Sequence, residues 1–218
     1  MVDFERARAQ MVENQLRSGG VTNAPILAQM RAIPRENFVA AIRRDLAYID
    51  DVQWFGGKAS GRFMAAPVTL GKLLRIAEIT PTDSVLDIGA ATGYSTAVIA
   101  GLAASVTGLE SDAELATTAA ANLAALGLTN ASVVAGDIER LGKARFDVII
   151  VQGALDSVPE AFTAALADGG RLVALIRVGA VSVAHVFVKS GRQVTARTEF
   201  NAVLPPLFAP QRDEEFIF

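Results

Sequence analysis

An aspartate and two glycines follow one another closely near the middle of the chain. Asp87 lies inside the apolar run 85–88, Gly89 comes directly after it, and Gly93 follows four residues later, where a helical pattern begins. Glycines let the backbone approach a nucleotide closely, and doubly wound sheets bind ligands beyond the carboxyl ends of their strands. The segment therefore predicts a nucleotide-binding turn. The plainer alternative is an ordinary turn between a strand and a helix.

Further polar side chains stand at the ends of the next strands. Glu110 follows Asp87 by 23 residues, and an acid at such a strand end can accept hydrogen bonds from both ribose hydroxyls. Asp137 ends the following strand, where a carboxylate suits an adenine amino group. Gln152 lies at the end of the buried strand after that. Each could be a solvated strand-end residue by itself, and their shared placement favours a nucleotide site.

The spacing of the turn argues against two other nucleotide sites. A dinucleotide fingerprint needs G-x-G-x-x-G, but Ala91 and Tyr94 stand where its second and third glycines would be. The Gly-Lys-Ser/Thr of a phosphate-binding loop is absent. Asp87 suits a cationic ligand better than a pyrophosphate. Since S-adenosylmethionine carries a sulfonium and an ammonium and no phosphate, the electrostatics favour it as the cofactor.

From residue 68 onward, short apolar strands alternate with helices, as in βαβ units. The helix over 111–126 is expected to begin with Ser111 as its cap and Glu114 as the capping-box partner, and to end at Gly127. Seven strands are predicted, over 84–88, 105–109, 132–135, 146–151, 171–176, 181–189 and 193–203, with further helices over 70–79, 96–103 and 159–167. The last two strands read as a hairpin. The fold class is thus α/β, a Rossmann-like three-layer sandwich whose mostly parallel seven-stranded sheet ends in antiparallel strands.

The region before the sheet is predicted to be an N-terminal helical extension. Residues 1–50 carry apolar faces interrupted at Gly19 and Gly20, and Pro25 suits the first turn of a second helix. Residues 51–67 read as a glycine-rich loop, and Trp54 makes a functional loop and a plain linker equally plausible.

Two parts of one structural unit are therefore expected. Residues 1–67 form the helical and substrate-loop extension, and residues 68–218 form the cofactor-binding domain.

Composition narrows the class of protein. With a net charge of −3 and a pI near 5.3, the chain shows no basic block for nucleic acid. It has no cysteine, and its one histidine, His185, is expected to be a strand residue at the sheet edge rather than a base, so no metal site is predicted. Apolar stretches are too short to span a membrane, and the charged N-terminus lacks a signal-peptide core. A cytoplasmic protein is expected, with a monomer favoured.

Residues 85–100 resemble the first motif of class I methyltransferases, and in particular that of the protein-L-isoaspartate O-methyltransferase family. The resemblance extends over most of the chain, and Ile33–Val39 is its most family-specific part. Other segments that carry it are 11–16, 30–39, 47–50, 126–130 and 169–173. It implies S-adenosylmethionine as cofactor and, as acceptor, a protein or peptide carboxylate, namely the abnormal carboxylate of isoaspartyl residues in damaged protein.

The motif and the resemblance together place the cofactor beside a definite set of residues. These are Asp87, Gly89, Ala90, Gly93, Tyr94, Glu110, Ser111, Asp137, Ile138 and Gln152.

Two departures from the family pattern bear on function. Ala91 replaces a central glycine, and an alanine fits there if its φ is negative. In the family, a Gln-Thr-Ile-Ser-Gln-Pro segment supplies a serine associated with the acceptor carboxylate, and Ala65 stands at that place here. Met64 and Ala65 are still expected to face the acceptor. Arg62 is either a substitute partner for its carboxylate or a solvated loop charge.

Three functions follow. The first is methylation of isoaspartyl residues. The second is a relative with an altered acceptor or little catalysis, which serves as an S-adenosylmethionine-binding module. The third, a nucleic-acid methyltransferase, is disfavoured because 152–155 lacks the expected Asn/Asp-Pro-Pro-Tyr.

Overall fold

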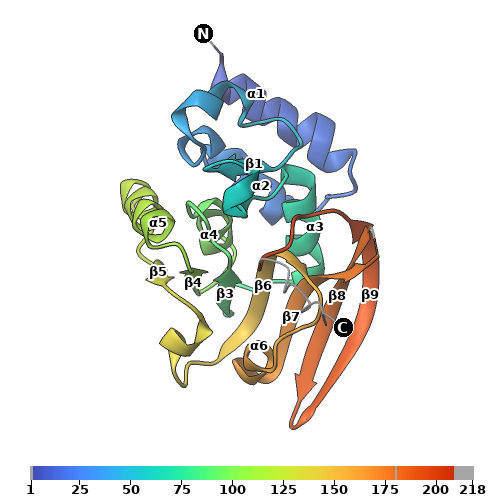
Figure 1. Ribbon diagram of the computed structural model, residues 1–218. Coiled ribbons are helices and arrows are strands. Elements are labelled where there is room, and N and C mark those ends of the chain that lie inside the picture. The colour runs from blue at the N-terminus through green and yellow to red at the C-terminus, as the bar shows by residue number, and fades with distance from the viewer. Residues whose placement is uncertain (1, 180, 209–218) are drawn as a thin grey trace, which may run out of the picture.

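One seven-stranded sheet forms the centre of the protein in the computed structural model, which describes residues 2–179 and 181–208 (Figure 1). The strand order is β5-β4-β3-β6-β7-β8-β9. Strands β3 to β7 run parallel, and β8 and β9 are antiparallel to their neighbours. This confirms the predicted fold class. The strands are β3 (Ser84–Ile88), β4 (Ser105–Glu110), β5 (Ala131–Ala135), β6 (Phe146–Leu155), β7 (Leu166–Val178), β8 (Val181–Ser190) and β9 (Gln193–Ala202).

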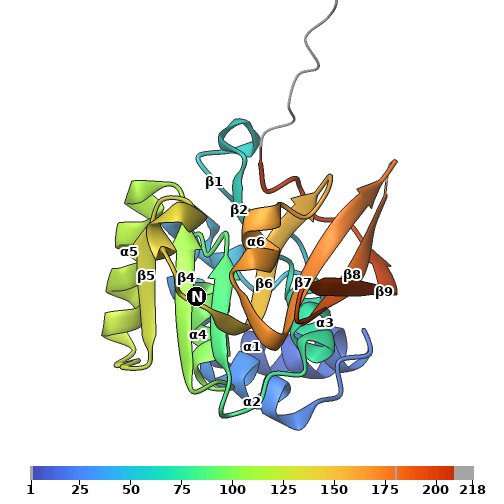
Figure 2. The same ribbon diagram turned by 90° about the horizontal axis from the view of Figure 1, so that it is seen from below.

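Helices cover the two faces of the sheet unequally (Figure 2). Helices α3 (Pro67–Ala77), α4 (Tyr94–Ala100) and α5 (Ala113–Ala125) pack on one face, whereas the short α6 (Glu160–Ala164) and η5 (Ile138–Leu141) lie on the other. Successive side chains of a strand point to opposite faces. In β6, Val148 and Ile150 therefore join the first core, and Ile149 and Val151 join the second.

The N-terminal extension is helical, as predicted, and it covers the ends of α3 and α4 (Figure 1). Gly20 has φ +87 at the interruption, and a proline stands in the first turn of the second α-helix. Its elements are α1 (Phe4–Gln10), the π-helix η1 (Met11–Arg17), α2 (Ala24–Ala32), η2 (Arg35–Asn37) and η3 (Ala41–Leu46).

Residues 51–67 contain regular secondary structure, so the prediction of a glycine-rich loop was wrong. Strands β1 (Gln53–Phe55) and β2 (Arg62–Met64) form an antiparallel hairpin around η4 (Lys58–Ser60). The Trp54 and Phe63 rings pack with centroids 5.5 Å apart. Strands of three residues are too short to show the alternation that reveals longer strands.

Two local predictions were also wrong. The cap of α5 is Asp112 instead of Ser111, and its carboxylate accepts from the N–H groups of Glu114 and Leu115, both at 3.0 Å. His185 lies in β8, which pairs on both sides, so it is not at the sheet edge. Its Nδ1 lies 2.9 Å from the Val183 carbonyl oxygen.

A buried arginine ties the extension to the rest of the protein. Arg35 is fully buried, and its Nε and Nη2 donate to the carbonyls of Ala47 at 2.8 Å and Ala65 at 2.7 Å. Its guanidinium carbon lies 4.7 Å from the centre of the Tyr94 ring. Burial lowers the pKa of Arg35, an effect opposed by the nearby Tyr94. One side chain thus connects the extension, the β1–β2 hairpin and the first residue of α4.

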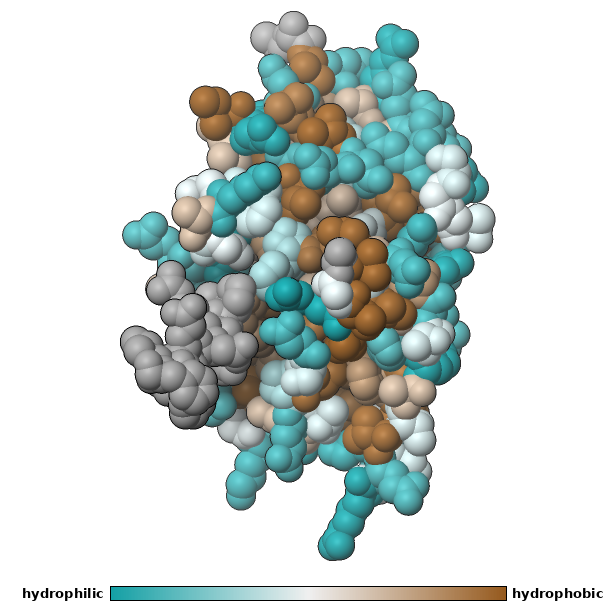
Figure 3. Space-filling view, turned by 45° about the vertical axis from the view of Figure 1, so that its right-hand side comes forward, coloured by the Kyte–Doolittle hydropathy of each residue, from teal (hydrophilic) through white to brown (hydrophobic). Residues whose placement is uncertain are grey.

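The surface carries some exposed apolar side chains. Figure 3 shows apolar side chains gathered near the middle of one face, within mainly hydrophilic surroundings. Val178 and Val181, which pair where β7 meets β8, are among the exposed ones, as is Val203 after β9. Within residues 2–179 and 181–208, none of the helices has the length and apolar character that crossing a membrane requires.

The turn after β3 has an unexpected conformation. Ala91 has φ +48, so the negative φ that was named as the condition for an alanine to fit here is not met. The left-handed region costs a residue with a Cβ roughly 1–2 kcal/mol. The Ala91 N–H donates to Glu110 Oε2 at 2.8 Å. We attribute the conformation to this hydrogen bond together with the close packing around a residue that is 3% exposed.

Replacing Arg35 tests the role of the buried guanidinium. Arg35→Met leaves the Ala47 and Ala65 carbonyls without their donors, so it is expected to lower the free energy of unfolding by about 2–4 kcal/mol. The matched control is Arg44→Met, which changes an exposed arginine of the same extension and should cost less than about 1 kcal/mol. Urea denaturation measures both variants. Equal small losses would show that Arg35 is not a structural link.

Replacing Ala91 tests the backbone strain. Ala91→Gly is expected to raise the free energy of unfolding by about 0.5–1 kcal/mol, because glycine adopts a positive φ without the Cβ penalty. Ala90→Gly is the control, since Ala90 is not among the residues with positive φ and should only lose stability. A destabilised Ala91→Gly protein in a thermal melt would contradict the strain.

Candidate functional site

The first part of the site is a carboxylate buried at the end of β3. Asp87 is fully buried and accepts three hydrogen bonds, from Ser95 Oγ at 2.6 Å, Thr96 Oγ1 at 2.7 Å and Gln152 Nε2 at 2.7 Å. Burial raises the pKa of Asp87, and these three donors act in the opposite direction. A buried charge is tolerated when it is hydrogen-bonded. Asp87 therefore fixes the start of α4 and the end of β6 around its strand.

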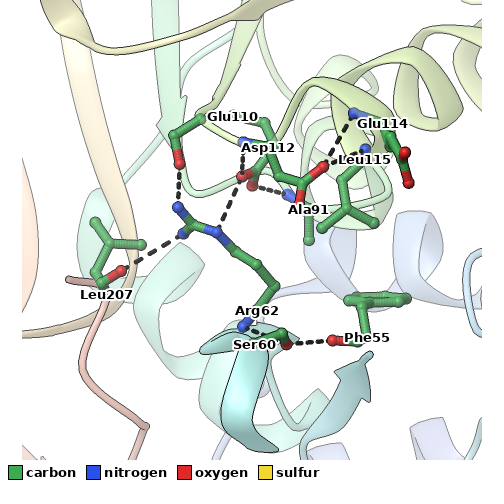
Figure 4. A network of polar contacts seen from close by, with 10 residues as sticks. Phe55, Ser60, Arg62, Ala91, Glu110, Asp112, Glu114, Leu115 and Leu207 are labelled. Carbon is green, nitrogen blue, oxygen red and sulfur yellow. Dashed lines mark hydrogen bonds and ion pairs between the residues drawn. The ribbon is translucent and has the colours of Figure 1, made fainter. Parts of the chain in front are cut away.

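The second part is the carboxylate at the end of β4 (Figure 4). Glu110 is 1% exposed. Its Oε2 accepts from the Ala91 N–H at 2.8 Å, and its Oε1 accepts from the Asp112 N–H at 2.9 Å. Two backbone N–H groups, one from the glycine turn and one from the start of α5, thus orient this side chain.

Arg62 reaches Glu110 from the β1–β2 hairpin. Its Nε lies 3.4 Å from Glu110 Oε1, and its Nη2 contacts the Ser111 hydroxyl. Nη1 lies 3.5 Å from the Leu207 carbonyl oxygen. Figure 4 shows the guanidinium between Glu110 and Leu207. Arg62 is therefore held in the site and is not a solvated loop charge.

A pocket of about 320 Å³ opens beside these residues, and we call it the cofactor-side pocket. Apolar side chains from β4, η5 and α6 form much of its wall, with Ser111 and Asp137 at polar positions. Its lining residues are Arg62, Ile88, Gly89, Leu109, Ser111, Gly136, Asp137, Ile138, Glu139, Pro159, Ala161, Phe162, Leu207 and Phe208. Such a mixture of apolar walls and a few polar groups is typical of a small-molecule site.

A second, much smaller cavity of about 10 Å³ lies next to the glycine turn. It brings together further predicted residues from the hairpin, the turn and β6, namely Met64, Ala65, Gly89, Ala90, Tyr94 and Gln152. The Gln152 Oε1 atom is buried and has no hydrogen-bond partner among the described residues. The Tyr94 hydroxyl is in the same condition, and burial raises the pKa of Tyr94.

Several predicted residues lie beneath the pocket walls instead of in them. Asp87 and Glu110 are covered, and Gly93 caps α4 with φ +92, where an added Cβ would approach Ala119. These residues shape the turn, and the structure gives them no place in the pocket lining.

The segment after β9 contributes Leu207 to the site. The Leu207 N–H donates to the Ala154 carbonyl at 2.9 Å, and the Ala154 N–H donates to the Pro205 carbonyl at 2.9 Å. A Cβ on Gly89 would come within 2.6 Å of Leu207. The φ of +83 at Gly89 also favours glycine at this position. Of the predicted cofactor-binding domain 68–218, residues 180 and 209–218 lie outside the described part of the chain.

The residues present fit an adenosine-containing cofactor. Glu110 is a buried acceptor whose chain neighbours Leu109 and Ser111 line a pocket with apolar walls, and Gly89 leaves the backbone open with φ +83. Ser111 and Asp137 line the same pocket. No cluster of residues suited to hold a metal ion occurs among the described residues.

The sequence of this chain is similar to those of one family of known proteins. The family model of protein-L-isoaspartate(D-aspartate) O-methyltransferase matches residues 6–214. The chain is 39% identical over 190 residues to protein-L-isoaspartate O-methyltransferase of Koribacter versatilis, covering 86% of this chain and 83% of that protein. It is 37% identical to protein-L-isoaspartate O-methyltransferase 1 of Rhodopseudomonas palustris strain HaA2, covering 87% and 76%.

Solved structures agree in fold. A protein-L-isoaspartate O-methyltransferase superposes with a TM-score of 0.78 at 23% identity, over 93% of this chain and 66% of that chain. A putative enzyme of the same name from Plasmodium falciparum, in complex with S-adenosyl-L-homocysteine, superposes with a TM-score of 0.77 at 20% identity, over 92% and 98%. The extent of the family match and the identity to these relatives show that this chain belongs to the protein-L-isoaspartate O-methyltransferase family.

Proposed function

We propose that the protein transfers the methyl group of S-adenosylmethionine to the side-chain carboxylate of isoaspartyl residues in proteins or peptides. The observation that carries this proposal is Glu110, a buried carboxylate at the end of β4. It lies beside a pocket whose apolar walls and few polar groups suit adenosine. Family membership supports the reaction, because the relatives bear the name of that activity.

In this proposal the predicted residues have distinct roles. Glu110 accepts hydrogen bonds from the ribose. The adenosine pocket is lined by Ser111, Asp137 and Ile138, and Gly89 permits close approach of the cofactor to the backbone. Asp87 lies behind them, where its negative charge favours a cationic ligand.

The bound cofactor supplies an electrophilic methyl group on a sulfonium. A carboxylate acceptor is already a nucleophile near neutral pH, so the chain's task is to position it and to exclude water. His185 lies in β8 against Phe187 and lines none of the described pockets around Arg62. It is not needed as a base.

The acceptor carboxylate still requires hydrogen-bond donors. Ala65 supplies none from its side chain, and its carbonyl is taken by Arg35. Arg62, whose side chain is 21% exposed, is the proposed substitute. The second candidate, an S-adenosylmethionine-binding module with little catalysis, draws its support from the same Ala65.

Changing Glu110 tests the cofactor site. Glu110→Ala is expected to weaken S-adenosylhomocysteine binding by about 1–3 kcal/mol, because a charged acceptor of hydrogen bonds is lost. The control is Glu114→Ala, which removes an exposed carboxylate from the first turn of α5. Calorimetric titration measures the affinities. Binding that is unchanged in Glu110→Ala would refute the assignment of this residue.

A methyl-transfer assay tests the proposed acceptor. Labelled S-adenosylmethionine is offered with an isoaspartyl peptide and with the matching aspartyl peptide, and we expect transfer to the isoaspartyl peptide alone. Ala65→Ser should raise this transfer little, because Arg62, Phe63 and Ala66 also differ from the family segment. Cofactor binding without transfer to either peptide would support the binding module and contradict the proposed reaction.

A further inference from the structure

Arg62 stands in the wall between two pockets. One is the cofactor-side pocket. The other, which we call the acceptor-side pocket, has a volume of about 420 Å³, and its lining comes from the β1–β2 hairpin and from the segment after β9. It is lined by Trp54, Lys58, Ala59, Ser60, Gly61, Arg62, Pro205, Pro206, Leu207 and Phe208. Among the described residues, Arg62, Leu207 and Phe208 line both pockets, and Arg62 is the charged one.

The hydrogen-bond capacity of Glu110 limits what can bind there. A carboxylate offers about four acceptor positions, two on each oxygen. Oε1 already accepts from the Asp112 N–H and faces Arg62 Nε, and Oε2 accepts from the Ala91 N–H. One position is left, whereas two ribose hydroxyls need two. The backbone donors are fixed by the turn and by the start of α5, so Arg62 is the partner that can leave.

The charge of the acceptor-side pocket favours an anionic ligand that Arg62 can bind. Its described lining contains two cationic side chains, Lys58 and Arg62, and no carboxylate. A pocket of this charge suits an anion, and a guanidinium binds carboxylates through paired hydrogen bonds. Apart from Glu110, the partners of Arg62 are neutral: the Leu207 carbonyl oxygen, at 3.5 Å, and the Ser111 hydroxyl.

We propose that Arg62 competes with the cofactor ribose for Glu110 and, once displaced, binds the carboxylate of the methyl acceptor in the acceptor-side pocket. The proposal rests on the proposed function. Arg62 is then a positioning and specificity residue that couples the two ligands. Cofactor binding releases the guanidinium for the acceptor, and an acceptor that holds the guanidinium leaves Glu110 open. By linkage, each ligand raises the affinity for the other.

Calorimetric titration with S-adenosylhomocysteine tests the competition. Arg62→Gln removes the competing cation and is expected to bind this ligand about two- to fivefold more tightly than the wild type, as suits a partly exposed ion pair. The control is Arg192→Gln, an exposed arginine in the turn between β8 and β9, which should bind as the wild type does. Unchanged or weaker binding by Arg62→Gln would overturn the proposal.

A second measurement needs only the wild-type protein for its main arm. An isoaspartyl peptide is expected to raise the wild-type affinity for S-adenosylhomocysteine severalfold, and the matching aspartyl peptide should not. In Arg62→Gln the effect should vanish. If the isoaspartyl peptide leaves the affinity of the wild-type protein for S-adenosylhomocysteine unchanged, the coupling is overturned. If folded wild-type protein does not bind S-adenosylhomocysteine at all, the proposed function itself fails, which is a distinct outcome.

Discussion

Two carboxylates are buried at the carboxyl ends of adjacent parallel strands, and they determine how the surrounding turns and side chains are arranged. Asp87 is fully buried and Glu110 is 1% exposed. A buried charge without partners is expensive, so donors must surround each of them. Ser95, Thr96 and Gln152 serve Asp87, while backbone N–H groups and Arg62 serve Glu110. Satisfying these charges fixes the glycine turn and the start of α5, which form the base of the candidate site.

Segments that are far apart in the sequence contribute to the walls. Arg35 anchors the β1–β2 hairpin through the Ala65 carbonyl, and Thr92 Oγ1 donates to the Phe38 carbonyl at 2.6 Å. At the other end of the chain, Leu207 is held by Ala154 and lies against Gly89. The N-terminal extension and the C-terminal segment thus meet at Arg62, which explains how one side chain can border both pockets.

Much of this could be predicted from sequence, because the relevant signals are local. Short apolar runs alternating with helices indicate a parallel sheet, and the acids at strand ends indicate where a ligand belongs. The φ of Ala91 could not be predicted, because a hydrogen bond to Glu110 and packing accompany it. The contact between Arg62 and Leu207 joins residues 145 positions apart, which no local pattern reveals. The choice of Asp112 over Ser111 as the cap depended on one residue of register.

In the proposed complex, Glu110 binds the cofactor ribose, and Arg62 must leave Glu110 for this to occur. A crystal structure of the protein with S-adenosylhomocysteine would show both features. Both ribose hydroxyls should lie within hydrogen-bond distance of Glu110, and the Arg62 guanidinium should be out of contact with Oε1. Ligand bound with its ribose away from Glu110, or with the Arg62–Glu110 pair intact, would rule out this exchange of partners.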